Sequence, residues 1–135
     1  MTRLRDPEFP LTMLGDERGQ LAVLEQGINV PFDIKRVYHI FGTQPGVRRG
    51  FHAHIELQQL AVCTSGQCTI LLDDGNEQRH IKLTRPDQGL LIDPMVWHEM
   101  YDFSDGCVLM VLANDLYDES DYIRDYDTFM KRVSL

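Results

Sequence analysis

Residues 46–54 read Gly-Val-Arg-Arg-Gly-Phe-His-Ala-His, and this stretch points to both the fold and the chemistry. In a β-strand, side chains two residues apart point to the same face, so His52 and His54 project together while Phe51 and Ala53 point the other way. Two adjacent imidazoles on an apolar strand would lose hydration without obvious partners. The pair therefore indicates a metal site or acid–base chemistry rather than two structural histidines.

Downstream residues extend the pair into a pattern with fixed spacing. The pattern resembles the two signatures of the cupin superfamily, which read here Gly46-x5-His52-x-His54-x4-Gln59-x6-Gly66 and Pro94-x3-His98. Cupins are double-sheet jelly rolls, and the resemblance predicts that His98 faces the barrel interior. Gln59 stands where cupins usually have a metal-binding glutamate, and an amide oxygen is a weaker ligand than a carboxylate. We therefore expect no metal and no other cofactor, although three histidines alone hold zinc in some catalytic sites.

Turn residues recur every 8–12 residues along most of the chain, between segments rich in branched and aromatic side chains. The segments expected to form strands are 20–26, 34–41, 57–63, 67–72, 77–83, 89–93, 97–103 and 107–113. Residues 64–67 (Thr-Ser-Gly-Gln) predict a hairpin, and residues 73–76 (Asp-Asp-Gly-Asn) predict a second turn. The pattern is typical of an antiparallel sandwich or barrel. We expect a single cupin domain over 1–135, all-β, with a double-stranded β-helix (jelly roll).

The C-terminal segment has a different periodicity. Tyr122, Tyr126, Phe129 and Val133 recur at three- and four-residue steps, which predicts a short C-terminal helical segment, or two helical turns, packed on the sheet. Its acidic start and basic end suit the helix dipole.

The composition limits the partners. The chain has 135 residues and a formal net charge of −8, which argues against generic binding to nucleic acid or membrane. Residues 1–60 are neutral overall and the acidic surplus lies in residues 61–135, so an anionic ligand is expected against the first part. No apolar run approaches the roughly 20 residues of a membrane span, and the N-terminus shows no hydrophobic signal region. The three cysteines lack a Cys-x-x-Cys spacing, so we expect free thiols in a cytoplasmic protein.

A narrower resemblance covers residues 14–131. It is carried by the motifs Arg36-Val-Tyr-His-Ile-Phe41, Arg49-Gly-Phe-His-Ala-His54, Leu72-Asp-Asp-Gly75, Trp97-His-Glu-Met100, Asp102-Phe-Ser104 and Tyr117-Asp-Glu-Ser-Asp-Tyr-Ile-Arg124. Together these motifs resemble those of the sugar 3,4-ketoisomerases (WxcM-like cupins). The resemblance implies a metal-independent homodimer whose partner is a dTDP-linked 4-keto-6-deoxyhexose. The product would be the 3-keto sugar, on the route to 3-amino-3,6-dideoxyhexoses of surface polysaccharides.

The resemblance also implies catalytic residues. The family's catalytic pair falls on His52 and His54, and we expect His54 to move the carbon-bound proton while His52 serves the oxygens or the reprotonation. The family often has a second tyrosine after Tyr38; His39 stands there and is expected to act as an altered proton donor.

Six residues are expected to bind the substrate: Arg49, Arg18, Gln59, His98, Tyr38 and Trp97. The guanidinium of Arg49 offers a fork of donors suited to diphosphate oxygens, three residues before His52. The indole of Trp97 is expected to stack on the base or the sugar.

The residues suit the reaction that the resemblance implies. A 4-ketone acidifies the neighbouring C–H, and an imidazole, with an ordinary pKa of about 6.5, can remove that proton to give an enediolate. Three alternatives remain: a 3,5-epimerase-like cupin on the same sugar nucleotide, a non-catalytic small-molecule-binding cupin, and a metal-dependent dioxygenase. Neither the nucleotide nor the galacto or gluco configuration of the product follows from the residues.

Overall fold

The computed structural model describes residue 4 and residues 7–134. The elements are, in chain order, β1 (Glu8–Pro10), β2 (Thr12–Asp16), β3 (Gly19–Val23), β4 (Arg36–Ile40), β5 (Arg49–His54), β6 (Gln59–Ser65), β7 (Cys68–Asp73), β8 (Gln78–Leu83), β9 (Gln88–Ile92), β10 (Trp97–Tyr101), β11 (Val108–Ala113), η1 (Glu119–Asp121), β12 (Tyr122–Ile123) and α1 (Tyr126–Val133). No helix in the described part of the chain is long and apolar enough to cross a bilayer. Residues 1–3 and 5–6, which belong to the N-terminus interpreted above, lie outside the described residues.

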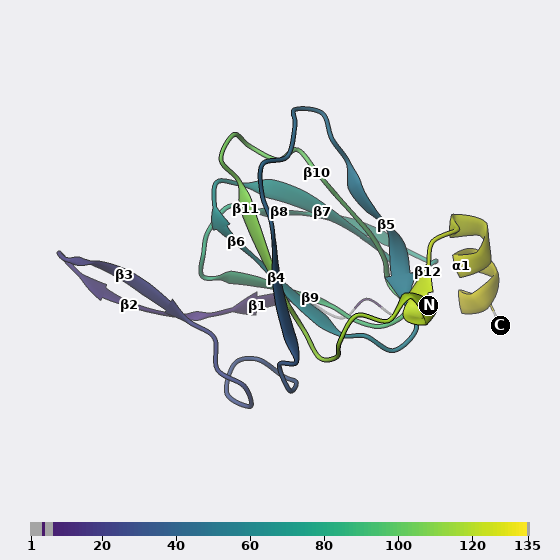
Figure 1. The fold of residues 1–135 in the computed structure, drawn as a ribbon, viewed down its shortest axis with the longest axis horizontal. Coiled ribbons are helices and arrows are strands. Elements are labelled where there is room, and N and C mark those ends of the chain that lie inside the picture. Colours follow the sequence, from purple (N-terminus) through teal and green to yellow (C-terminus); the bar gives the residue numbers. More distant parts are fainter. Residues whose placement is uncertain (1–3, 5–6, 135) are drawn as a thin grey trace.

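Two five-stranded antiparallel sheets enclose the barrel (Figure 1). Their strand orders are β1-β9-β6-β11-β4 and β12-β5-β10-β7-β8. This arrangement confirms the expected all-β jelly roll with a short C-terminal helix.

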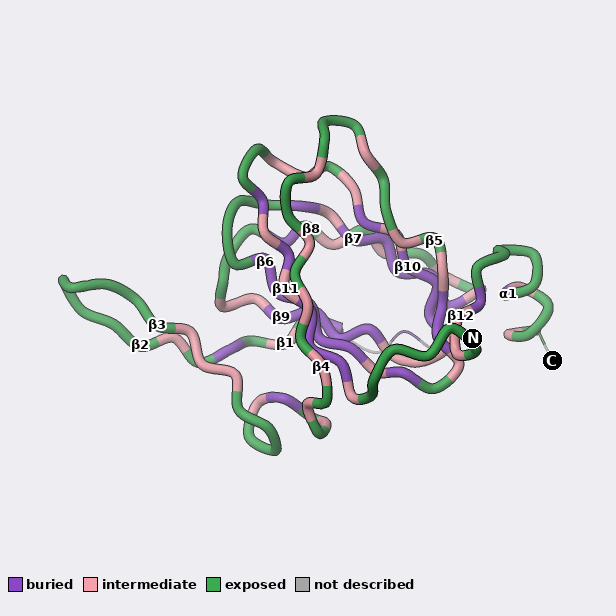
Figure 2. The backbone as a smooth tube through the Cα atoms, in the orientation of Figure 1, coloured by how far each residue is buried: buried purple, intermediate pink, exposed green. Residues whose placement is uncertain are grey.

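The main core lies between the two sheets. Alternate residues of β6, β7, β9 and β11 face it, which is the period-two pattern of strands packed face to face. Figure 2 shows that buried residues are concentrated along these strands. The three cysteines, Cys63, Cys68 and Cys107, are buried in this core as free thiols, as expected.

The predicted hairpin at residues 64–67 is wrong. Strand β6 pairs with β9 and β11, whereas β7 pairs with β8 and β10, so the turn crosses from one sheet to the other. Gly66 adopts a φ of +70°, and a Cβ there would lie 2.4 Å from Ser104 Oγ. The glycine therefore permits a tight turn between the two sheets. In the sequence, such a turn has the same glycine-containing pattern as a hairpin. The turn at residues 73–76 joins β7 and β8, which do pair antiparallel, so that turn is confirmed.

The hairpin β2–β3 projects from the body of the barrel (Figure 1). Only its second strand was expected from the sequence. Leu14 and Leu21 face each other across the two strands and remain 58% and 56% exposed. An isolated two-stranded hairpin of this kind is only marginally stable in water.

The C-terminal segment only partly follows the predicted helical stripe. The helix α1 begins at Tyr126, after its N-cap Asp125, whereas Tyr122 belongs to the short strand β12. Strand β12 pairs with β5, and Tyr122 lies opposite His54. Phe129 of α1 is fully buried. The tail therefore docks on the outer side of the strand that carries the histidine pair.

Candidate active site

Three histidines gather on the inner face of the second sheet. His52 and His54 come from β5, and His98 comes from β10, where it pairs in register with His52. One ring nitrogen of each lies within 4.8 Å of the others. The ring centroids of His52 lie 4.9 Å from His54 and 4.4 Å from His98. The predicted convergence of the three residues is confirmed.

Backbone carbonyls fix the orientation of two of these rings. His52 Nδ1 donates to the oxygen of Gly50 at 3.0 Å, and His98 Nδ1 donates to the oxygen of Val96 at 3.1 Å. Because a carbonyl oxygen can only accept, both imidazoles carry a proton on Nδ1. Their Nε2 atoms are left with free lone pairs.

Burial keeps the cluster uncharged near neutral pH. Desolvation lowers the pKa of His52, with a smaller contribution from Arg124. Desolvation and the neighbouring His52 lower the pKa of His54 to about 4, although Asp121 opposes the shift. Desolvation also lowers the pKa of His98. Neutral imidazoles at pH 7 can accept protons, which is what a general base requires.

A bulge in β5 brings this strand close to β10. Gly50 has a φ of +94° and Phe51 a φ of +58°, and the β5–β10 register shifts between His98 and Glu99. A Cβ on Gly50 would lie 2.8 Å from the carbonyl oxygen of His98. Bulges frequently re-aim side chains beside active sites. Here the glycine permits the approach that places His52 opposite His98.

A pocket of about 390 Å³ opens beside His52. Basic and aromatic side chains line it: Arg36, Arg49, Arg124, Tyr38 and Tyr122. The ring of Tyr122 lies 4.8 Å from that of His52 and 4.4 Å from that of His54. Three guanidinium groups around one pocket suit an anionic ligand, although the net charge of the whole chain is negative.

Gln59 and Tyr38 form a pair inside the barrel. Gln59 Nε2 donates to the hydroxyl of Tyr38 at 2.8 Å, and Gln59 Oε1 has no partner among the described residues. Burial raises the pKa of Tyr38, so its phenol stays protonated and can donate a hydrogen bond. Gln59 therefore acts on the pocket through Tyr38, which lines it.

Three expected site residues do not join the histidine cluster: Trp97, His39 and Arg18. Trp97 is buried on the opposite face of β10 from His98, against Tyr126 and Phe129. Its indole therefore cannot stack on a ligand in the pocket.

His39 also borders the pocket, yet its side chain is exposed because strand alternation turns it away from the face of Tyr38. Arg18 lies at the turn of the projecting hairpin, with its side chain 86% exposed and paired with Asp16. The structure does not bring either residue to the histidine cluster of its own chain.

Sequence reasoning assigned no role to three residues that the structure brings to the cluster: Asp121, Tyr122 and Arg124. Their signal was present in the motif Tyr117–Arg124, which carried part of the family resemblance. The motif alone did not show that a two-residue strand would lay them against β5.

The donor set for a metal consists of three neutral imidazoles and the amide of Gln59. His52, His54 and His98 are close enough to share an ion. The set lacks a carboxylate to offset a divalent charge. The Nε2 of Gln59 donates to Tyr38, and its Oε1, a weaker ligand than a carboxylate oxygen, has no partner among the described residues.

The comparisons with known proteins agree with this geometry. A family profile described as "FdtA: WxcM-like, C-terminal" matches residues 7–134. A curated relative from Aneurinibacillus thermoaerophilus, TDP-4-oxo-6-deoxy-alpha-D-glucose-3,4-oxoisomerase, is 55% identical over 119 residues, which cover 88% of this chain and 86% of the relative. The chain belongs to the FdtA/WxcM-like family. It is a sugar 3,4-ketoisomerase.

Solved structures of ketoisomerases superpose closely on this family member. A histidine-to-asparagine mutant of QdtA from Thermoanaerobacterium thermosaccharolyticum, in complex with TDP-4-keto-6-deoxyglucose, has a TM-score of 0.92 at 42% identity and covers 94% of this chain and 92% of its own. The TDP-quinovose 3,4-ketoisomerase WlaRB from Campylobacter jejuni has a TM-score of 0.88 at 48% identity, with 92% and 95% covered. The likeness favours the isomerase over the epimerase, binding-module and dioxygenase alternatives.

Proposed function

We propose that this ketoisomerase converts TDP-4-keto-6-deoxyglucose to the 3-keto-6-deoxyhexose. The observation that carries the proposal is a cluster of neutral histidines beside a pocket lined by Arg36, Arg49 and Arg124. The arginines suit a diphosphate, and the imidazoles suit proton transfer next to a ketone. Relatives with 42% and 55% identity bind or act on this sugar nucleotide.

The reaction moves protons and requires no change in overall oxidation state. A base removes the proton from C3, beside the 4-ketone, and the electron pair of the broken C–H bond gives an enediolate. The proton on the C3 oxygen shifts to the C4 oxygen. The conjugate acid of the base then delivers a proton to C4, which leaves a ketone at C3 and a hydroxyl at C4. Donors near the developing oxyanion stabilise the intermediate.

The geometry favours His52 as the carbon base, the reverse of the expectation from sequence. His52 lines the arginine pocket, whereas His54 is 2% exposed and is not among the residues that line it. The Nδ1–H of His52 is held by a carbonyl, so Nε2 is the atom free to accept a proton. We assign His54 the shift of the proton from the C3 oxygen to the C4 oxygen.

Product analysis by NMR tests the proposed function. Incubation with TDP-4-keto-6-deoxyglucose and a coupled 3-aminotransferase should give a 3-amino-3,6-dideoxyhexose. Inversion at C5 would indicate an epimerase, and the absence of turnover would indicate a binding protein; either result would refute the proposal.

Replacing Arg49 by alanine should raise the KM for the sugar nucleotide by about 10- to 100-fold. A hydrogen bond to a charged group contributes roughly 1.5–3 kcal/mol, and Arg49 lines the pocket. Steady-state kinetics measure the effect. Arg85→Ala is the matched control, since Arg85 pairs with Asp87 on the surface. An unchanged KM in Arg49→Ala would remove this residue from the binding site.

We propose that catalysis needs no bound metal. The donor set supports this, because Gln59 replaces the expected anionic ligand and the proton transfers above use only imidazoles. Dialysis against EDTA should leave kcat unchanged. Loss of turnover that a divalent ion restores would contradict this proposal.

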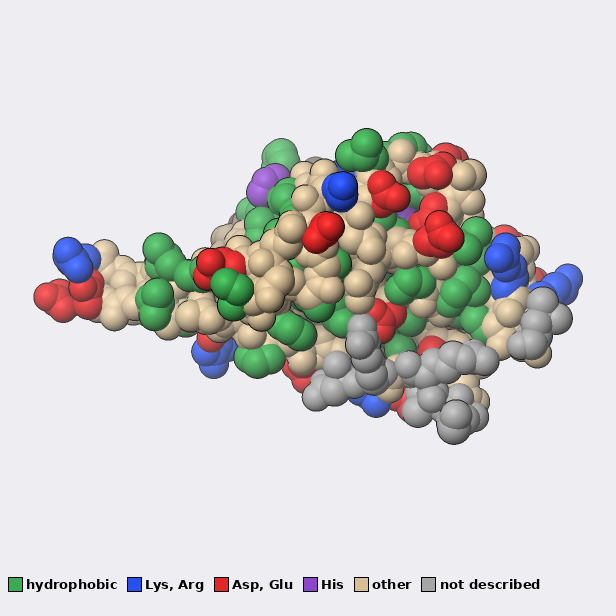
Figure 3. All heavy atoms as spheres, turned by 90° about the horizontal axis from the view of Figure 1, so that it is seen from below, with side chains coloured by type: hydrophobic (Ala, Val, Ile, Leu, Met, Phe, Trp, Pro, Cys, Tyr) green, Lys and Arg blue, Asp and Glu red, His purple; other side chains and the backbone are tan. Residues whose placement is uncertain are grey.

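We propose a homodimer in which the β2–β3 hairpin packs on a second copy. Hydrophobic side chains lie along the projecting arm in Figure 3. Leu14 and Leu21 belong to this hairpin and are exposed in the single chain. Arg18 at the turn of this arm lies outside the pocket of its own chain, so a role in substrate binding requires the pocket of the second copy. The free cysteines of the core support a cytoplasmic location, which cell fractionation would test.

The substitution Leu14→Asp should convert the dimer to a monomer, because a charge at the centre of an apolar contact is costly to bury. Light scattering after size-exclusion chromatography measures the mass. Leu116→Asp, at a residue 66% exposed on the body of the barrel, serves as the control. A wild-type protein of monomer mass would disprove the dimer.

A further inference from the structure

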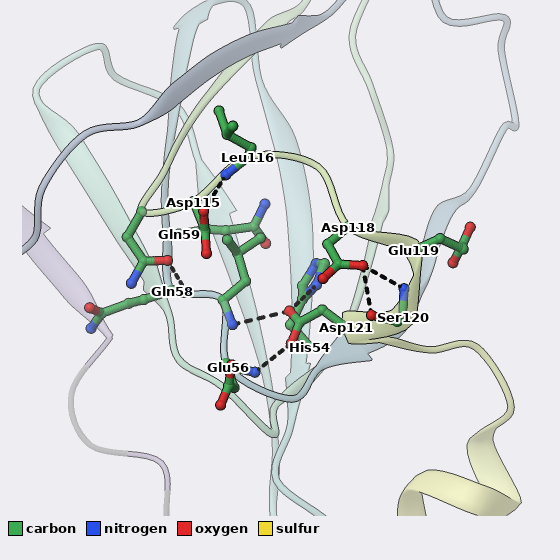
Figure 4. Close-up of polar contacts among 12 residues, drawn as sticks. His54, Glu56, Gln58, Gln59, Asp115, Leu116, Asp118, Glu119, Ser120 and Asp121 are labelled. Carbon is green, nitrogen blue, oxygen red and sulfur yellow. Dashed lines mark hydrogen bonds and ion pairs between the residues drawn. The ribbon is translucent and has the colours of Figure 1, made fainter.

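A carboxylate lies beside the histidine cluster, next to His54. Asp121 Oδ2 lies 3.3 Å from Nδ1 of His54 (Figure 4). We infer that Asp121 is a positioning residue that holds His54 in its Nδ1–H tautomer and directs the free lone pair of Nε2 toward His52 and His98. The inference rests on the proposed role of His54 as a proton shuttle.

The carboxylate itself is held in place from several sides. Oδ1 of Asp121 accepts from the backbone N–H of Glu56 at 2.8 Å, and Oδ2 accepts from that of Leu57 at 3.1 Å. The backbone oxygen of Asp121 accepts from the N–H of Ile55 at 2.9 Å. Figure 4 shows the carboxylate between this backbone segment and the ring of His54. Both side-chain oxygens are therefore fixed, and the group cannot easily turn away from the imidazole.

His54 depends on this contact. The residue is 2% exposed, and neither of its ring nitrogens has a hydrogen-bond partner among the described residues apart from the ion-pair contact with Asp121. The other groups in contact with its ring are the rings of His52, His98 and Tyr122. Asp121 thus supplies the acceptor nearest to Nδ1.

The carboxylate keeps access to water. The side chain of Asp121 is 16% exposed and lines a pocket of about 220 Å³ that lies beside His54. Both of its oxygens accept from backbone N–H groups, so the carboxylate presents an acceptor to the imidazole. An acceptor facing Nδ1 selects the tautomer with its proton on Nδ1.

The three imidazoles then share one arrangement. His52 and His98 direct Nδ1–H to the carbonyl oxygens of Gly50 and Val96, and His54 directs it to Asp121. Each ring keeps its Nε2 lone pair for the centre of the cluster. His54 differs in that its acceptor is a carboxylate, which opposes the lowering of its pKa by burial and by His52 and stabilises the imidazolium that forms while a proton is shuttled. A carboxylate behind one histidine thus makes that histidine the shuttle.

The substitution Asp121→Asn tests this role. When the amide oxygen takes the place of Oδ1 and accepts from the backbone N–H of Glu56, the amide NH2 takes the place of Oδ2, where it faces Nδ1 of His54 and favours the opposite tautomer. We expect kcat to fall by about 10- to 100-fold with KM changed by less than about twofold, in line with the effect of residues that orient a functional imidazole. Asp118→Asn is the matched control, since Asp118 lies in the same segment and its carboxylate binds Ser120 rather than His54.

Nitrogen-15 NMR of the histidine rings separates this role from a merely structural one and from failure of the proposed function. In the wild-type protein, Nδ1 of His54 should give the signal of a protonated ring nitrogen, and in Asp121→Asn that signal should move to Nε2. A wild-type spectrum with the proton on Nε2 would overturn the inference even if the variant did not fold. An inverted tautomer with wild-type kcat would overturn it as well, whatever the substrate proves to be.

Discussion

Replacing His52 by asparagine is expected to lower kcat by about 10³-fold while the affinity for TDP stays within a few-fold of wild type. General acid–base catalysis by a positioned side chain contributes roughly 10²–10⁴-fold, and His52 is the cluster histidine that lines the arginine pocket. Asparagine retains polarity and approximate size but cannot accept and return a proton at neutral pH. Turnover followed by NMR gives kcat, and calorimetry gives the affinity for TDP.

Incorporation of deuterium from solvent adds a second readout for the same variant. If His52 removes the C3 proton, exchange at this carbon should fall together with turnover. His80→Asn is the control, because His80 contacts the hydroxyl of Tyr101 on the exposed surface. Wild-type turnover in His52→Asn would show that another group is the base, and exchange that persists without turnover would place His52 in the reprotonation step.

The histidine cluster could be predicted because its signal is local. Strand alternation places His52 and His54 on one face, and the cupin-like spacing adds His98 to them. The structure contains this cluster, with one nitrogen of each ring within 4.8 Å of the others. The face to which a strand residue points follows directly from its spacing in the sequence, so this part of the site could be predicted.

The tail was harder because two periodicities compete there. Tyr122 continues the helical stripe of Tyr126 and Phe129, but in the structure it pairs with β5 opposite His54. A strand of two residues is too short to show the alternation of polar and apolar side chains by which strands are predicted. Tertiary pairing therefore decides the position of Tyr122, and with it that of Asp121.

Strand alternation would have excluded Trp97 from the site. Once His98 is placed inside the barrel, its neighbour must face the outside, and the same reasoning removes Glu99. In the structure the indole nitrogen of Trp97 donates to Glu99 Oε2 at 2.8 Å on that outer side. Trp97 was predicted to bind substrate because an indole can stack on a base or a sugar. In the structure its side chain packs against α1 instead.

The net charge of this protein and the charge around its pocket have opposite signs. The total of −8 argues against a polyanion-binding surface, yet three arginines line one pocket. Arg36 and Arg49 come from the neutral first part of the chain, as the uneven charge predicted. Arg124 comes from the acidic tail, which folds back on β5 through β12. Only the fold could show that the acidic half also contributes a cation.

Replacing Phe129 by alanine should destabilise the protein by about 3–5 kcal/mol, the usual cost of removing a fully buried phenylalanine side chain. Phe129 is 0% exposed and packs with Trp97, Ile123 and Ala53. Ala53 lies between the two histidines of β5 and points to the opposite face. The substitution therefore leaves a cavity directly behind the strand that carries His52 and His54.

Denaturant unfolding measures the loss, with Phe41→Ala as the control because Phe41 is 71% exposed. Below the unfolding transition, kcat of Phe129→Ala should also fall, since α1 and β12 hold Tyr122 and Asp121 against His54. A loss of stability below about 1 kcal/mol would mean that α1 is not docked as described. The cavity and the histidine cluster lie on opposite faces of the same strand. A loss of about 3–5 kcal/mol in the free energy of unfolding with unchanged kcat would therefore show that β5 holds its histidines without support from the tail.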